Sequence, residues 1–177
     1  MSTKVVTGEV RFSYLQVFEP KAIEDGADPK YSVSLVIPKE DKKTIAKFEA
    51  AIEAAKEQGK SKWGGKTPAS LKLPLRDGDK DRPDDPVYEN CMFVNATSKQ
   101  RPGLVDANVD PIMDQTELYS GCYGRASVNL YPFSVSGNKG IACGLNHLQK
   151  TKDGTPLGGK NRPEDDFDAV ESDSMLD

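Results

Sequence analysis

Histidine is almost missing from this chain of 177 residues, and the only one is His147. A single histidine excludes metal sites built from several imidazoles and makes a histidine-based catalytic triad a poor interpretation. Cysteine is nearly as scarce. Cys91, Cys122 and Cys143 stand far apart without CxxC spacing, and an odd number cannot pair completely, so we expect reduced cysteines packed in the interior. No cofactor or metal is expected.

The chain also lacks long hydrophobic runs. No stretch of about 18 apolar residues exists, which excludes a membrane-spanning helix, and the first residues lack the apolar segment of a signal peptide. Hydrophobic residues make up 36% of the chain, which is enough for one modest core. We therefore expect one cytosolic domain.

Basic residues are absent from the end of the chain. Residues 163–177 contain seven Asp and Glu residues and no Lys or Arg. Subtracting these seven from the 28 acidic residues leaves 21 against 24 basic residues in residues 1–162. A basic body beside an acidic end favours a nucleic-acid partner or an interaction tail. We expect a domain over residues 1–162 and a disordered tail over residues 163–177, because the tail has little apolar surface to bury.

Alternation of apolar and polar residues predicts five main strands, separated by glycine and proline turns. In the first strand, Val10, Phe12 and Tyr14 share the parity expected to face the core, with a bend expected near Gly8 or Ser13. The five strands are expected at residues 4–18, 31–38, 87–96, 121–135 and 141–150.

One helix is expected at residues 41–58, where Phe48, Ile52 and Ala55 recur on one face and Asp41 can cap the first turn. Residues 59–86 have the composition of a long loop. Five strands with a helix between the second and third predict a mainly β fold, a five-stranded antiparallel barrel of the OB type with long loops.

The strand at residues 121–135 is the most informative stretch. Its even positions are small or aliphatic and suit a core, whereas its odd positions include Tyr123, Arg125, Asn129 and Tyr131. Exposed aromatic rings stack on bases, and arginine contacts phosphates and bases, so this face fits a single nucleic-acid strand. The alternative is that Tyr131 and Phe133 only seal the end of the barrel.

A second candidate lies in the long loop, where Trp63, the only tryptophan, stands among Lys60, Lys62 and Lys66. Such a residue suits a base-stacking finger. The alternative is a tryptophan that folds back to cover the barrel. The sequence GKT at residues 65–67 lacks the earlier glycine and the following helix of a phosphate-binding loop, which excludes that motif.

Charged loops supply the remaining candidates. Lys99 and Arg101 follow the third expected strand and, with Arg76, can contact a phosphate backbone. The nearby Asp77, Asp79 and Asp81 can hold Mg²⁺ for a nuclease. Turn-forming Asp-Gly and Asp-Pro pairs explain this cluster adequately, and the pattern departs from a calcium loop.

Several phrases together resemble a family of phage-encoded single-stranded DNA-binding proteins from replication and recombination modules, long catalogued as a domain of unknown function. The phrases occupy residues 10–14 (VRFSY), 31–39 (YSVSLVIPK), 62–66 (KWGGK), 75–79 (LRDGD), 95–102 (NATSKQRP), 119–126 (YSGCYGRA) and 138–145 (NKGIACGL). The resemblance implies an OB fold, single-strand binding without sequence preference, an acidic C-terminal tail, and action in the cytoplasm of an infected bacterium.

These observations predict a binding protein that coats single strands during phage DNA replication, recombination or repair, with duplex DNA bound more weakly. The acidic tail is expected to compete with DNA and to bind replication or recombination proteins, or else merely to aid solubility. The alternatives are a Mg²⁺-dependent nuclease and a structural protein of the virion. The expected DNA-binding residues are Lys62, Trp63, Lys66, Arg76, Lys99, Arg101, Tyr119, Tyr123, Arg125 and Tyr131, and those of the tail are Asp165, Asp166, Phe167, Asp168, Met175 and Leu176.

Overall fold

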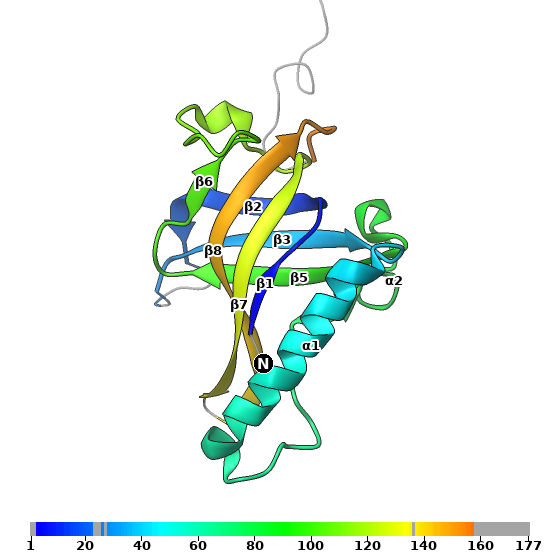
Figure 1. Cartoon of the computed structure of the whole chain (residues 1–177), viewed down its shortest axis with the longest axis vertical. Coiled ribbons are helices and arrows are strands. Elements are labelled where there is room, and N and C mark those ends of the chain that lie inside the picture. Colours follow the sequence, from blue (N-terminus) through cyan, green and yellow to red (C-terminus); the bar gives the residue numbers. More distant parts are fainter. Residues whose placement is uncertain (1–2, 23–25, 27, 136, 158–177) are drawn as a thin grey trace, which may run out of the picture.

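The computed structural model describes residues 3–22, 26, 28–135 and 137–157 (Figure 1). The strands are β1 (Lys4–Val6), β2 (Val10–Lys21), β3 (Lys30–Pro38), β4 (Leu75–Asp77), β5 (Cys91–Ser98), β6 (Gly103–Val105), β7 (Tyr123–Val135) and β8 (Asn138–Lys152). The helices are α1 (Lys42–Gly59) and the short α2 (Gly78–Asp81), with 3-10 turns at Lys60–Trp63, Pro86–Tyr88 and Gln115–Glu117. The expected domain boundary at residue 162 and the acidic tail lie outside the described residues.

Five of these strands close into a ring. β3 pairs antiparallel with β2 and with β5, and β5 makes a short parallel contact with β8. The hairpin of β8 and β7 then returns to β2 through an antiparallel pairing. In Figure 1, β2, β3 and β5 run across the view, and β7 and β8 cross over them. The short strands β1, β4 and β6 extend the ring by pairing with β7, β5 and β8.

The predicted mainly β fold is confirmed, and its one main helix lies between the second and third strands of the ring. Two details differ from the prediction. The described residues form eight strands rather than five, because residues 75–77 and 103–105 are too short to show alternation and residues 4–18 form two strands. The pairings of β8 with β5 and β6 are parallel, so the sheet is mixed rather than antiparallel.

Helix α1 begins where the sequence predicts. The Asp41 carboxylate accepts hydrogen bonds from the Thr44 backbone N–H (3.2 Å) and hydroxyl (2.8 Å), which satisfies an otherwise unpaired donor of the first turn. Phe48, Ile52 and Ala55 are buried, as expected for one apolar face. The helix packs against β7 and β1.

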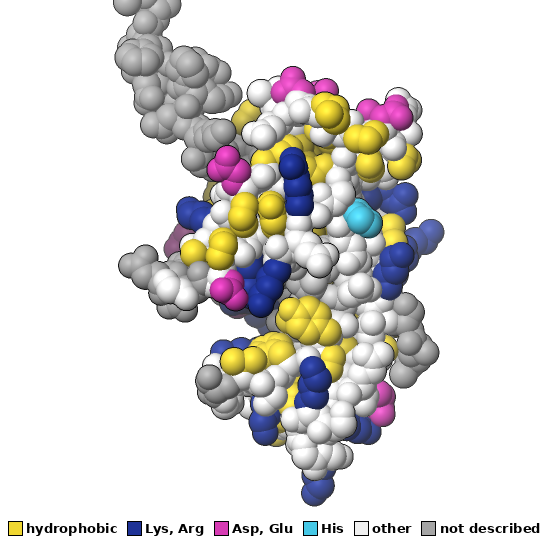
Figure 2. Space-filling view, turned by 90° about the vertical axis from the view of Figure 1, so that its left-hand side faces the viewer, with side chains coloured by type: hydrophobic (Ala, Val, Ile, Leu, Met, Phe, Trp, Pro, Cys, Tyr) yellow, Lys and Arg dark blue, Asp and Glu magenta, His cyan; other side chains and the backbone are white. Residues whose placement is uncertain are grey.

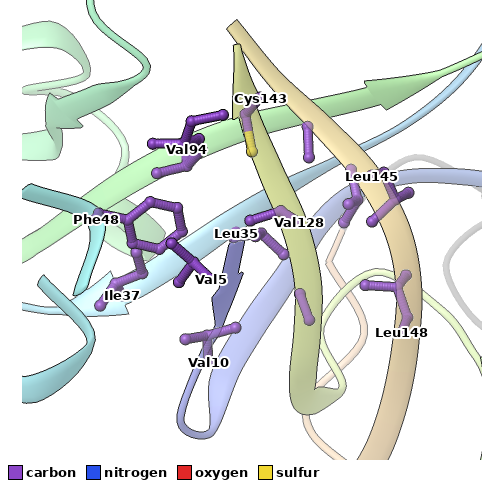
Figure 3. Packing of buried hydrophobic residues seen from close by; sticks show 14 of the residues in the cluster. Val5, Val10, Leu35, Ile37, Phe48, Val94, Val128, Cys143, Leu145 and Leu148 are labelled. Carbon is purple, nitrogen blue, oxygen red and sulfur yellow. The ribbon is translucent and has the colours of Figure 1, made fainter. Parts of the chain in front are cut away.

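The core fills the interior of the ring. In Figure 3, Phe48 points from α1 toward Val5 of β1 and Ile37 of β3. All three side chains are at most 2% exposed, and each contributes roughly 1.5–3 kcal/mol by leaving water. Cys122 and Cys143 are also buried, whereas Cys91 is half-buried, so the expectation of interior cysteines holds for two of the three.

A second, smaller cluster lies on the outer side of β3 and β5. Tyr88 and Phe93 meet edge to face with ring centroids 5.0 Å apart, and Val36 completes the cluster. The Tyr88 hydroxyl donates a hydrogen bond of 3.0 Å to Ser34 Oγ. This part of the outer face is therefore covered by the segment that follows α2.

Strand β2 contains a bulge that reverses its alternation. Ser13 pairs with Ser34 and Gln16 pairs with Ser32, so β2 advances three residues while β3 advances two. Phe12 and Val17 both point inward as a result, and Tyr14 is pushed out. The prediction that Tyr14 faces the core is wrong for this reason, although the irregularity falls at Ser13 as expected.

Within the described ranges, neither helix has both the length and the apolar character needed to cross a membrane.

Candidate nucleic-acid interface

The outer side of β7 alternates as predicted. Gly124, Ala126 and Val128 are buried, whereas Arg125 and Asn129 are exposed. The outward positions of β7 therefore lie on the surface of the ring, where they can meet a ligand.

A shallow groove of about 390 Å³ crosses this surface. β1, β7, β8 and the end of β5 with the turn after it all contribute, and the lining is mainly polar. The lining residues are Lys4, Ser98, Gln100, Arg101, Ser127, Asn129, Leu145, Asn146 and His147. Figure 2 shows Lys and Arg side chains gathered beside the histidine on one face of the molecule.

Strand register extends the groove into a continuous polar row across the ring. Gln16 of β2 pairs with Ser32 of β3, Ser32 with Thr97 of β5, Thr97 with Gly144 of β8, Gly144 with Asn129 of β7, and Asn129 with Lys4 of β1. We call these six residues the polar row. Five steps between strands, each about 4.8 Å, give a path of about 24 Å. Lys4 and Asn129 are exposed and the other four residues are half-buried, so every residue of the row reaches solvent.

Tyr131 lies on β7 next to Gly144 of the polar row. Tyr131 is 45% exposed. Its ring lies beside Gly144, and a Cβ added to that glycine would be 3.4 Å from the ring edge. A glycine inside a strand often marks a bulge, a bend, or a place where a ligand or another backbone comes close. The ring and the bare backbone beside it form a flat surface on which a base can stack.

The amides beside Tyr131 are held only loosely. Asn129 Nδ2 lies 3.5 Å from Asn146 Oδ1, and Asn146 Nδ2 lies 3.5 Å from Ser127 Oγ. These distances are at the long limit of a hydrogen bond. The three side chains can therefore turn to donate to or accept from a ligand at small cost.

His147 anchors the basic turn beside the groove. The Gly103 backbone N–H donates a hydrogen bond of 3.2 Å to His147 Nδ1, where β6 pairs with β8. This contact fixes the end of the segment that carries Arg101. Nothing in the sequence signals this role of His147, because the contact depends on Gly103, which lies 44 residues away along the chain.

The groove brings together part of the predicted set. Arg101 lines it and forms no ion pair with any residue that the structure describes. Lys99 lies in the same turn, where its Nζ is 3.5 Å from an Asp28 carboxylate oxygen. Arg125 shares the outward side of β7, and its Nε donates a 3.0 Å hydrogen bond to the Thr7 carbonyl.

Tyr119 and Tyr123 lie apart from the groove and already have partners. The Tyr119 hydroxyl donates a hydrogen bond of 2.8 Å to the Asp153 carboxylate, and burial is the main cause that raises the pKa of this phenol. The Tyr123 ring lies 4.6 Å from Lys152 Nζ and 5.4 Å from the Arg11 guanidinium. Tyr119 also packs against the core, and Tyr123 lies between two cations, while contact of either ring with DNA stays a prediction.

Trp63 is not the exposed finger that the sequence suggested. The residue is 6% exposed, and its indole Nε1 donates a hydrogen bond of 3.0 Å to the Phe133 carbonyl. Gly59 leaves room for the ring, because an added Cβ would be 2.6 Å from it. Trp63 therefore closes the end of the core, while Lys62 and Lys66 remain exposed in its loop.

The acidic cluster makes structural ion pairs. Lys39 Nζ lies 2.9 Å from Asp77 and 2.7 Å from Asp79, and Arg76 Nε lies 2.8 Å from Asp81. The hydrogen bonds from Lys39 hold the pKa of both Asp77 and Asp79 below the usual value. In the described ranges, no three His, Cys, Asp or Glu residues are grouped to hold a metal ion. Arg76, a predicted DNA contact, is thus paired with Asp81 at the surface.

A ring of strands that carries a polar groove, basic side chains and an exposed tyrosine on its outer surface is typical of β-proteins that bind nucleic-acid strands. The sequence identifies the group more closely. A family model described as Enterobacter phage Enc34, ssDNA-binding protein, matches residues 3–176. The chain belongs to this family.

Individual relatives agree with this assignment. Protein p50 of Acyrthosiphon pisum secondary endosymbiont phage 1 is 30% identical over 187 aligned residues, which cover 98% of both chains. The single-stranded DNA-binding protein of bacteriophage Enc34, solved in complex with single-stranded DNA, has a TM-score of 0.78 and 29% identity over 88% of this chain and 90% of that one. The gp2.5 single-stranded DNA-binding protein of bacteriophage T7 shares the fold, with a TM-score of 0.63 and 15% identity over 97% of each chain.

Proposed function

We propose that this chain binds single-stranded DNA without sequence preference and acts in phage DNA replication, recombination or repair. The observation that carries the proposal is the polar row, with the Tyr131 ring beside its Gly144 and Arg101 in the groove that it extends. Family membership supports it, as does similarity to a phage protein solved with single-stranded DNA.

We also propose that the ring is a barrel of the OB type. In such barrels, five strands form a partly open Greek-key barrel that binds oligonucleotides across its outer face and the adjoining loops. The ring order β2, β3, β5, β8, β7 and the one long helix, α1, between β3 and β5 support this assignment.

Binding would combine two physical effects. Arg101, Lys99 and Lys4 attract phosphates and release counterions, so affinity falls as salt rises. Base stacking on Tyr131 is worth roughly 1–3 kcal/mol and is tolerant of sequence, since every base has a flat face. Asn129 and Asn146 can hydrogen-bond to whichever base or sugar lies beside them. Lys62, Lys66 and Arg125 would add longer-range attraction, since they lie outside the groove lining.

The proposed activity is binding without chemistry and needs no cofactor. The alternative is a Mg²⁺-dependent nuclease that uses Asp77, Asp79 and Asp81, and the ion pairs of these carboxylates with Lys39 and Arg76 weigh against it. Incubating labelled single strands with and without Mg²⁺ separates the two, because a nuclease would cleave them and an Asp79→Ala variant would not.

We further propose that the chain has a domain over residues 1–162 and an acidic tail over residues 163–177. The protein would act in the cytoplasm of the infected bacterium. The tail would compete with DNA for the basic groove and contact replication or recombination proteins through Phe167, Met175 and Leu176. Deleting residues 163–177 should strengthen binding to single strands at low salt. Equal or weaker binding by the shortened chain would remove competition from the proposal.

The experiment that tests the main proposal is a salt series of affinities for single-stranded DNA, duplex DNA and RNA of equal length. We expect the tightest binding to single-stranded DNA, with little difference among base compositions. Preference for duplex DNA at every salt concentration, or failure to bind any nucleic acid, would contradict it.

A further inference from the structure

Tyr14 is the most exposed aromatic ring among the tyrosines and phenylalanines of the described residues, at 60% compared with 45% for Tyr131. It is the extra residue of the bulge in β2. The ladder is interrupted there, and the Leu15 N–H donates to Ser120 Oγ at 2.9 Å instead of to a strand. Bulges re-aim side chains and are common beside functional sites.

The backbone of Tyr14 is strained. Its φ of 48° lies in the left-handed region, which is unfavourable for a residue with a large side chain. The fold therefore holds the ring outward at a cost to stability. Strained residues of this kind gather at ligand sites, where orientation of the side chain matters more than stability.

A cation supports the Tyr14 ring. The Arg82 guanidinium lies 5.3 Å from the centroid of Tyr14, 5.1 Å from that of Tyr88 and 5.6 Å from that of Phe93. Arg82 forms no ion pair with any carboxylate of the described residues. Its positive charge is held in place by aromatic rings and is available to a phosphate.

A small hollow of about 160 Å³ lies beside the same ring. Ser13, Tyr14, Asp85, Val87 and Leu157 line it. The hydroxyl and the carboxylate suit the edge of a base, while the two aliphatic side chains suit its flat face or a sugar. The hollow is thus mixed in character, as expected of a nucleotide subsite rather than a purely apolar docking site.

The site adjoins the polar row. Gln16, the β2 end of the row, is two residues from Tyr14 along the strand, a distance of about 6 Å. Tyr14, Arg82 and Tyr88 all lie on the outer side, where Tyr88 contacts Ser34 of β3. A DNA strand that follows the row from Lys4 to Gln16 and then turns along β2 would reach the Tyr14 ring next.

We propose that Tyr14 is a second base-stacking platform, which with Arg82 binds one nucleotide beyond the Gln16 end of the polar row. The inference rests on the proposed function and extends it, because it assigns a subsite outside the groove. It makes the bulge a device for presenting the ring.

The test measures the affinity of the wild type and of Tyr14→Ala for oligo-dT of increasing length. Fluorescence anisotropy of the labelled oligonucleotide reports binding. Oligonucleotides that are too short to extend from the polar row to Tyr14 should bind both proteins equally. Longer ones should bind the variant about tenfold more weakly, as expected for the loss of one stacked base. Tyr14→Phe should restore binding to within about twofold, since it keeps the ring. Val109→Ala is the matched control, because Val109 is also exposed with a positive φ (66°) but lies outside the groove and the hollow.

Tyr14→Gly separates binding from folding. Glycine tolerates the left-handed conformation, so this variant should melt no lower than Tyr14→Ala while losing the same affinity for long oligonucleotides. Wild-type affinity of both variants at every length would overturn the inference and leave the proposed function intact. Unchanged DNA affinity with altered sedimentation would also overturn it, since the ring would then serve a protein contact. Failure of the wild type to bind any single strand would instead overturn the proposed function.

Discussion

The outer face of β3 and β5 has two halves, one covered by other residues of the chain and one open to solvent. Near one end, the paired Val36 and Phe93 are covered by Tyr88. Four residues along, the paired Ser32 and Thr97 belong to the open polar row. The backbone pairing is the same in both halves, so the outward side chains decide which half the chain covers with its own residues and which it leaves to a ligand.

The largest expected effect comes from breaking the covered half. Phe93→Ala removes a buried ring that packs against Tyr88 and should lower the free energy of unfolding by roughly 3–5 kcal/mol. Thr97→Ala in the open half should change it by less than about 0.5 kcal/mol. Urea unfolding of both variants measures the contrast, and similar losses would show that the two halves do not differ.

Removing the exposed ring on β7 beside the polar row should have the next largest effect. Tyr131→Ala is expected to weaken binding to oligo-dT by about tenfold, within the range for one stacked base, while the melting temperature stays within a few degrees. Anisotropy titration and thermal unfolding check the two parts. A large loss of stability with unchanged affinity would mean that Tyr131 only seals the end of the ring.

A smaller effect distinguishes two predicted arginines. Arg101→Ala should reduce the slope of log affinity against log salt by about one, because one phosphate contact is lost. Arg76→Ala should leave the slope unchanged, since Arg76 is paired with Asp81. Titrations at four salt concentrations are sufficient, and equal slopes for the two variants would contradict the placement of the groove.

The smallest effect concerns pH. Lys39 holds the pKa of Asp77 and Asp79 below the usual 3.8. Since these values are depressed in the folded state, their contribution to stability is present above the unfolded pKa and is lost as pH falls through the folded pKa. Urea midpoints measured from neutral to acidic pH should decline below about pH 4, and less steeply in Lys39→Ala. Parallel curves would show that Lys39 does not stabilise this segment.

Local patterns predicted much of the fold. The periodicity of Phe48, Ile52 and Ala55 predicts α1, and the cap at Asp41 predicts its start, because both depend on residues within a few turns. Alternation in β7 likewise predicts which of its residues are outward. Each of these signals is contained in one stretch of sequence.

Features that depend on distant contacts could not be predicted in this way. Trp63 is buried because Gly59 makes room for its ring and Phe133 accepts its N–H, and neither contact is visible in the local pattern of lysines. Unbroken alternation along β2 predicts that Tyr14 faces the core, but the bulge after Ser13 turns it outward. The polar row can be recognised only when the register of six strands is known.

The most direct test of the central claim places a side chain in the polar row. Gly144 has no positive φ, an added Cβ would make only ordinary contact, 3.4 Å from the Tyr131 ring, and valine suits a strand, so we expect Gly144→Val to fold, with thermal unfolding as the check. Its branched side chain would stand beside Tyr131 in the path of the DNA. We predict at least a roughly tenfold loss of affinity for oligo-dT, because the added side chain obstructs stacking on that ring. Wild-type affinity in a normally folded Gly144→Val protein would show that single-stranded DNA does not cross this face.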